Sequence, residues 1–199
     1  VENIATIAEI VSDYPDIPVV LDPVLSSGRG DEFANEDMIL AMRELLFPQT
    51  TIITPNSIEA RRLVQDEMED SDELDLGQCG ERILHMGCEY VLITGAHENT
   101  RQVTNTLYTG SGVVRSDVWQ RLTGSYHGSG CTLASAIAAT IANGLPVSDG
   151  VYEAQEYTWQ ALKSGFHPGM GQYLPDRLFW ARNEHDSKEE DELDVEPKD

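Results

Sequence analysis

A single cysteine follows a glycine-rich turn at the start of a segment of small apolar residues. The turn is Gly128-Ser129-Gly130-Cys131, and the segment that continues from it, CTLASAIAATIANG, has the composition of a buried helix. Glycines let a backbone approach a ligand closely, and the first turn of a helix leaves N–H groups unpaired at the positive end of the helix dipole. The turn is therefore a candidate anion site, and phosphate is its natural ligand.

Cys131 has two further interpretations. The positive field at a helix start favours the thiolate, which makes Cys131 a candidate base or nucleophile. The alternative is a small buried core residue, with glycines that serve only close packing. A hydrolase that pairs Cys131 with His127 is disfavoured, because the two residues lie across a tight turn and no third group is evident to orient the histidine.

Polar residues also follow three predicted strands. In TPNSIEA, Asn56 and Glu59 are three residues apart at the start of a predicted helix, a spacing that suits a metal ion held beside phosphates. The alternative for this pair is helix capping. Asp22 precedes a proline and is either a turn former or part of a site at the ends of the strands, and Thr94 with Gly95 ends the third strand.

Alternating helices and strands must position these residues. Helical spacing in IATIAEIV, EDMILAMRELLF, SIEARRLV and ELDLGQCGERILHM alternates with the short apolar runs IPVVLD, TIIT and YVLIT. The second helix is expected to end before Pro48. This order predicts an α/β fold with a mostly parallel sheet and helices on both faces. Ligands of such sheets bind beyond the carboxyl ends of the strands, where the loops at Asp22, Thr54, Thr94 and Gly124 begin.

The second half of the chain predicts a hairpin and two helices. VTNTLYTG and GVVRSDVWQ alternate around a glycine-rich turn, as in a hairpin at a sheet edge. The helix that opens at Cys131 is followed by VSDGVYEAQEYTWQALKSG, which begins after Pro146 with Ser148 as an N-cap candidate.

Composition limits the classes of function. The chain has 199 residues and a net charge of −22, of which much lies in 66–75 and in the tail 184–199, so we expect a solvated acidic loop and a disordered acidic tail. No basic stripe exists to bind nucleic acid, and no apolar run is long enough to span a membrane. Three cysteines predict no disulfide framework and a cytoplasmic protein, and Cys79, His85 and Cys88 fit no paired zinc pattern.

Four segments together resemble a known family. VVLDPVLSSGRGD, TIITPNSIEARRL, YVLITGAH and HGSGCTLASAIAATIANGL, with GMGQYLPDRLFWA near the end, look like hydroxymethylpyrimidine/phosphomethylpyrimidine kinase of the ribokinase-like superfamily. The resemblance implies phosphorylation of 4-amino-5-hydroxymethyl-2-methylpyrimidine and its monophosphate with ATP and Mg²⁺, by a protein that is a homodimer when full length. It also implies that residues 1–183 are the C-terminal part of a ribokinase-like domain whose first strands are missing.

The resemblance assigns roles to the residues above. Cys131 takes the proton of the substrate hydroxyl, and the backbone of Gly128, Ser129 and Gly130 forms the anion hole. Asn56 and Glu59 correspond to the metal and phosphate pair, Asp22 lies beside the metal, and Thr94 with Gly95 approaches the nucleotide phosphates.

Three positions depart from the family pattern. Ser129 stands where threonine is usual, Ala96 replaces a second glycine, and Asn105 replaces a common aspartate. Two alternatives stay open: a pyridoxal or hydroxyethylthiazole kinase on the same scaffold, and a non-catalytic nucleotide-binding module.

Overall fold

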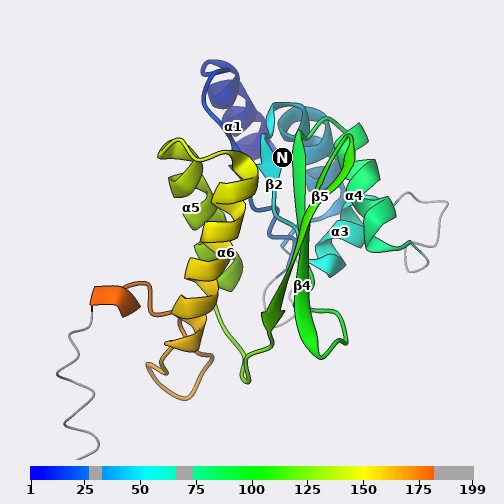
Figure 1. Ribbon diagram of the computed structural model, residues 1–199. Coiled ribbons are helices and arrows are strands. Elements are labelled where there is room, and N and C mark those ends of the chain that lie inside the picture. The colour runs from blue at the N-terminus through cyan, green and yellow to red at the C-terminus, as the bar shows by residue number, and fades with distance from the viewer. Residues whose placement is uncertain (27–32, 66–73, 182–199) are drawn as a thin grey trace, which may run out of the picture.

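A five-stranded sheet forms the centre of the structure, a computed structural model that describes residues 1–26, 33–65 and 74–181 (Figure 1). The strands lie in chain order: β1 (Val20–Leu21), β2 (Ile52–Ile53), β3 (Tyr90–Thr94), β4 (Gln102–Thr109) and β5 (Gly112–Gln120). β1, β2 and β3 pair in parallel, whereas β4 is antiparallel to both β3 and β5. Four of the five strands therefore run the same way, which confirms the predicted mostly parallel sheet with a hairpin at its edge.

Helices cover both faces of the sheet, as predicted (Figure 1). Ile53, Val91 and Ile93 pack in one hydrophobic cluster with residues of α1 (Glu2–Ser12), α2 (Glu36–Ala41), α3 (Ser57–Leu63) and α4 (Leu76–His85). Ile52, Leu92 and Leu107 pack on the other face with residues of α5 (Ser129–Ala142) and α6 (Val147–Lys163). Because successive strand residues point to opposite faces, one apolar run supplies both clusters.

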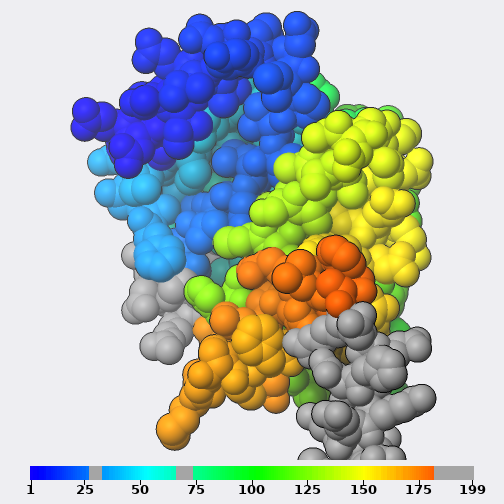
Figure 2. Space-filling model, turned by 90° about the vertical axis from the view of Figure 1, so that its left-hand side faces the viewer, coloured from blue at the N-terminus to red at the C-terminus, as the bar shows by residue number. Residues whose placement is uncertain are grey.

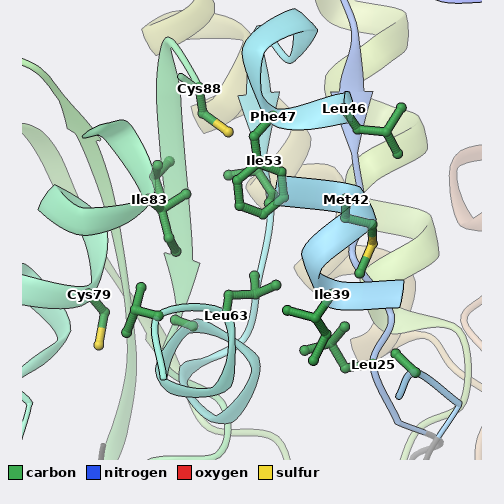
Figure 3. Packing of buried hydrophobic residues seen from close by; sticks show 14 of the residues in the cluster. Leu25, Ile39, Met42, Leu46, Phe47, Ile53, Leu63, Cys79, Ile83 and Cys88 are labelled. Carbon is green, nitrogen blue, oxygen red and sulfur yellow. The ribbon is translucent and has the colours of Figure 1, made fainter. Parts of the chain in front are cut away.

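The loop after β1 is anchored in the larger cluster. Leu25 is 1% exposed and lies next to Ile39 of α2 (Figure 3). Its carbonyl oxygen accepts hydrogen bonds from the backbone N–H groups of Phe33 and Ala34, at 2.9 and 3.2 Å. β1 has only two residues, so the buried Leu25 and its hydrogen bonds determine the direction of the chain after the strand.

Helix bounds differ from the prediction at two prolines. The helix expected to end before Pro48 continues from α2 through a π-helical turn, η1 (Met42–Leu46), into a 3₁₀ turn, η2 (Phe47–Gln49), that contains the proline. Proline is accepted there because the N–H it lacks is one that a first helical turn leaves unpaired.

The N-cap of α6 is Pro146 and not Ser148. Ser148 lies inside the first turn, where its carbonyl oxygen accepts a 3.1 Å hydrogen bond from Arg115 on β5. This contact with the sheet is not visible in the sequence, so the capping preference of serine gave the wrong position.

The acidic segments fall mostly outside the described ranges. The tail 184–199 lies outside them entirely, as do 66–73 of the acidic loop. Asp75, the last residue of that loop, caps α4 by accepting a 2.8 Å hydrogen bond from the backbone N–H of Gln78. Within the described ranges, no helix is long and apolar enough to span a bilayer.

We predict that Leu25→Ala lowers the free energy of unfolding by about 2–5 kcal/mol, the usual cost of truncating a fully buried leucine. The matched control is Leu40→Ala, because Leu40 is 48% exposed on α2 and its truncation should cost less than about 1 kcal/mol. Urea unfolding of both variants measures the difference. Equal losses in the two variants would show that the loop after β1 is not anchored in the core.

Candidate functional site

The glycine-rich turn begins α5 without a side-chain cap. Gly128 is the N-cap residue, with φ of 84°, and no side chain accepts a hydrogen bond at this end of the 14-residue helix. Residues with a Cβ rarely adopt such a left-handed conformation, so glycine is required at this position. The backbone N–H groups of Ser129, Gly130 and Cys131 thus have no acceptor inside the helix and are available to an anion.

Cys131 is exposed at this turn, so its interpretation as a buried core residue is wrong. The buried cysteines are Cys79 and Cys88, and burial raises the pKa of the Cys88 thiol to about 12. The Cys131 thiol lies close enough to the carboxylate of Asp22 to lower the pKa of that group. The reactive candidate among the three cysteines is therefore the one at the helix start.

Asp22 lies where the loop after β1 meets the start of α5. A Cβ built on Gly130 would lie 3.6 Å from Asp22 Oδ2. The pKa of Asp22 is raised to about 6, first by burial and second by the negative charge of Glu59. Hydrogen bonds from the Cys131 thiol and the backbone of Val24 oppose this rise without cancelling it. Asp22 is thus placed between a second carboxylate and a thiol.

Glu59 connects the loop after β1 to the start of α3. Its carboxylate is buried, at 7% exposure, and accepts hydrogen bonds from the backbone N–H groups of Leu25 (3.1 Å) and Asn56 (3.0 Å). The side chain of Asn56 accepts in turn from the N–H groups of Ile58 and Glu59, both at 2.9 Å. This reciprocal pattern is a capping box, which confirms the capping interpretation of the pair.

The donor chemistry at this edge fits Mg²⁺. Asp22 and Glu59 supply two carboxylates close enough for one to raise the pKa of the other, and Mg²⁺ is usually bound by one or two carboxylates together with phosphate and water oxygens. Among the described residues, no group of three or more His, Cys, Asp and Glu side chains could hold a metal. The two carboxylates alone would leave most positions around a metal ion to phosphate or water oxygens.

The end of β3 lies beside the capping box. Thr94 donates its backbone N–H to the Pro55 carbonyl at 3.0 Å and forms an isolated β-bridge with Asn56. Gly95 follows, and any side chain at this position would collide with the carbonyl oxygen of Thr104. The glycine therefore lets this loop pack against β4, and the strand ends that carry Asn56 and Thr94 are brought together as predicted.

A buried polar network that sequence reasoning missed holds Gly95 in place. The backbone N–H of Gly95 donates to Asn105 Oδ1 (3.1 Å), and Asn105 Nδ2 donates to Gln155 Oε1 on α6 (2.9 Å). Gln155 also donates to Asp117 on β5 and accepts from Trp119 Nε1, at 2.9 and 3.0 Å. An aspartate in place of Asn105 could not donate to Gln155 when ionised. The departure at Asn105 thus has a structural partner on α6.

Two arginines complete the surroundings of the site, and neither was singled out in the sequence. Arg121, just after β5, donates to the carbonyl oxygens of Ala96 (2.7 Å), Glu98 (2.9 Å) and Thr100 (3.0 Å), which fixes the loop that follows Gly95. Arg177 donates from Nε to Thr132 Oγ1 at 3.1 Å, within the first turns of α5. Arg177 belongs to the segment GMGQYLPDRLFWA, but no spacing in that segment indicates which helix it reaches.

Known proteins similar to this chain are phosphotransferases. The family model for phosphomethylpyrimidine kinase matches residues 1–176. A hydroxymethylpyrimidine/phosphomethylpyrimidine kinase of Rhizobium meliloti is 33% identical over 171 residues, which cover 86% of this chain and 64% of that protein. A pyridoxine kinase of Bacillus subtilis is 34% identical over 160 residues, covering 78% of this chain and 57% of that protein.

Solved structures share the fold. The ADP complex of Bacillus subtilis pyridoxal kinase superposes with a TM-score of 0.76 at 27% identity, covering 90% of this chain and 66% of that one. The chain therefore spans about two thirds or less of the length of these proteins.

We predict that Asp22 makes the stability of the metal-free protein depend on pH. A carboxyl group whose folded pKa is raised favours folding fully below its unfolded pKa of 3.8, and this contribution is lost as the pH rises through about 6. The free energy of unfolding of the wild type should therefore fall relative to that of Asp22→Asn between pH 4 and pH 6, by about 1–2 kcal/mol after allowance for partial exposure. Urea unfolding of both proteins from pH 4 to pH 6 measures this difference in the free energy of unfolding. A constant difference would contradict the burial and repulsion described for Asp22.

Proposed function

Because this chain belongs to the phosphomethylpyrimidine kinase family, we propose that it carries the phosphoryl-transfer site of an ATP-dependent kinase that phosphorylates 4-amino-5-hydroxymethyl-2-methylpyrimidine and its monophosphate in thiamine biosynthesis. The observation that carries the proposal is the exposed Cys131 thiol at the uncapped start of α5, close to the carboxylate of Asp22. One turn thus combines an anion-binding backbone with a candidate base for a substrate hydroxyl.

Each part of the turn has a task in such a reaction. The backbone N–H groups that follow Gly128 bind the oxygens of the phosphoryl group, where their fixed dipoles stabilise charge without reorganisation. As the thiolate, which the positive end of α5 favours, Cys131 accepts the proton of the attacking hydroxyl and becomes a thiol beside Asp22. Gly95, held by Asn105, presents backbone at the same sheet edge for the nucleotide phosphates.

Asp22 and Glu59 are the residues that would hold Mg²⁺. A magnesium ion bound there would neutralise phosphate charge and orient the transferring group. Glu59 already accepts two backbone hydrogen bonds, so it would offer its remaining lone pairs, directly or through water. The pKa of Asp22 is raised by burial and by the charge of Glu59, so this carboxylate would gain most from a bound cation.

A second candidate substrate is pyridoxine or a related alcohol. It is favoured by the Bacillus subtilis pyridoxine kinase, which is 34% identical to this chain, about as similar as the pyrimidine kinase of Rhizobium meliloti. The turn at Gly128 serves any primary alcohol, so the choice between substrates depends on contacts elsewhere. We place the protein in the cytoplasm, in keeping with its three free cysteines, and assign it a homodimeric state as the family resemblance implies.

The proposed function is tested by measuring phosphoryl transfer from ATP to each candidate alcohol. The protein is incubated with Mg²⁺, ATP and one alcohol at a time: the hydroxymethylpyrimidine, pyridoxine or hydroxyethylthiazole. Mass spectrometry then detects the phosphate ester. We expect the pyrimidine ester to form with the highest kcat/KM. Ester formation on pyridoxine alone would select the second candidate, and no ester on any alcohol would contradict kinase activity.

We predict that Cys131→Ala and Cys131→Ser each lower kcat by about 10²–10⁴-fold, the usual contribution of a positioned base. Affinity for ATP should change little, because the anion site is made of backbone. Cys131→Asp should be the least harmful replacement, since a carboxylate can also accept the proton. The control is Cys79→Ala, which removes a buried thiol of α4 on the other face of the sheet and should keep kcat. Full activity of Cys131→Ala in a single-turnover assay would remove the base assignment.

A further inference from the structure

Arg177 brings a positive charge to the glycine-rich turn from a distant part of the chain. Its Nε donates a hydrogen bond to Thr132 Oγ1 at 3.1 Å. Its Nη2 lies against Gly128, since a Cβ built on that glycine would be 3.2 Å away. The guanidinium group therefore lies at the N-terminal end of α5, where the helix dipole is also positive.

The segment that carries Arg177 is fixed to α6. The hydroxyl of Tyr157 donates to the carbonyl oxygen of Arg177 at 2.8 Å, and the backbone N–H of Asp176 donates to the Ala161 carbonyl at 2.8 Å. Figure 2 shows this segment, in orange, packed against the lower part of α5 and α6. The arginine backbone is thus held in place, and the side chain reaches the turn of α5 from a rigid base.

The side chain keeps donors available at the turn. A guanidinium group has five N–H donors. Among the hydrogen bonds between described residues, Arg177 uses Nε alone, so its terminal amino groups can donate to a bound anion. The Thr132 hydroxyl that holds Nε is buried and donates to the Gly128 carbonyl at 2.7 Å, which couples the guanidinium position to the conformation of the turn.

The guanidinium group of Arg177 offsets the negative charge that surrounds the turn. The chain carries a net charge of −22, and the turn is flanked by the carboxylate of Asp22. The surrounding negative field therefore opposes the binding of a nucleoside triphosphate. An arginine next to backbone donors compensates locally, because its planar group forms short, charge-assisted bonds to phosphate oxygens.

We propose that Arg177 binds the terminal phosphoryl group of the nucleotide at the Gly128–Cys131 turn and stabilises it during transfer. This inference rests on the proposed function for the site but names a residue that the glycine-cysteine motif does not contain. The role requires contact with the third phosphate of a triphosphate, so it predicts discrimination between ATP-like ligands and ADP.

The experiment compares the affinities of Mg²⁺-AMP-PCP and Mg²⁺-ADP by calorimetry for the wild type, Arg177→Met and Arg177→Lys. Arg177→Met should weaken AMP-PCP binding about tenfold or more and ADP binding less than about threefold, since one charge-assisted bond is lost only where a third phosphate is present. The affinity of Arg177→Lys for AMP-PCP should lie between those of the wild type and Arg177→Met. Thr132→Val, which removes the acceptor of Nε together with the hydrogen bond to the Gly128 carbonyl, should weaken AMP-PCP binding in the same direction but less.

The matched control is Arg82→Met, which removes the same charge from α4 on the opposite face of the sheet and should leave both affinities unchanged. Arg177→Met should also lower kcat by about 10²-fold, and added guanidinium ion should restore part of that loss. A purely structural arginine would give no such rescue.

The outcomes separate the two proposals. Equal changes in AMP-PCP and ADP affinity, or no change, would overturn the role of Arg177 even if the wild type phosphorylates the pyrimidine. A selective loss of AMP-PCP binding in a protein that phosphorylates no alcohol would support Arg177 and contradict the proposed reaction. A wild type that binds neither nucleotide would overturn both.

Discussion

The carboxylate of Glu59 is the contact on which the rest of the site depends. It is buried, and its two oxygens accept the backbone N–H groups of Leu25 and Asn56, so it joins the loop after β1 to the start of α3. β1 contributes only two residues to the sheet, and the strand alone cannot fix the direction of the chain beyond it. With Leu25 held by Glu59 and by the hydrophobic core, Asp22 reaches the start of α5 beside Gly130 and Cys131.

The same arrangement brings the negative charges of Asp22 and Glu59 close together. The pKa of Asp22 is raised first by its burial and second by the negative charge of Glu59. A bound cation would offset both the burial and the repulsion of the Asp22 carboxylate. A bound phosphate would in turn attract that cation. The uncapped first turn of α5, which lies beside Asp22, and the guanidinium of Arg177 provide the complementary positive potential. An acidic protein that uses a highly charged anion needs such local compensation, because its overall field opposes approach.

Much of this could be predicted from the sequence because the signals are local. Alternating helical and apolar segments gave the sheet and its two covered faces, and Gly128, Cys131 and the capping pair at Asn56 were each marked by residue type and spacing. What could not be predicted comes from distant partners. Ser148 contacts Arg115 instead of capping α6, Asn105 bonds to Gln155, and Arg177 reaches Thr132. These contacts join residues 33, 50 and 45 positions apart, so no period or motif in the sequence indicates them.

The most direct test of the account is a ¹⁵N NMR titration of the protein with Mg²⁺-AMP-PCP, observing backbone amides. The largest shifts are expected at Ser129, Gly130 and Cys131, with smaller shifts at Gly95, because the N–H groups at the start of α5 are proposed to bind the phosphates. Large shifts confined to another surface, such as the exposed face of α1, with unchanged amides at the start of α5, would contradict this role.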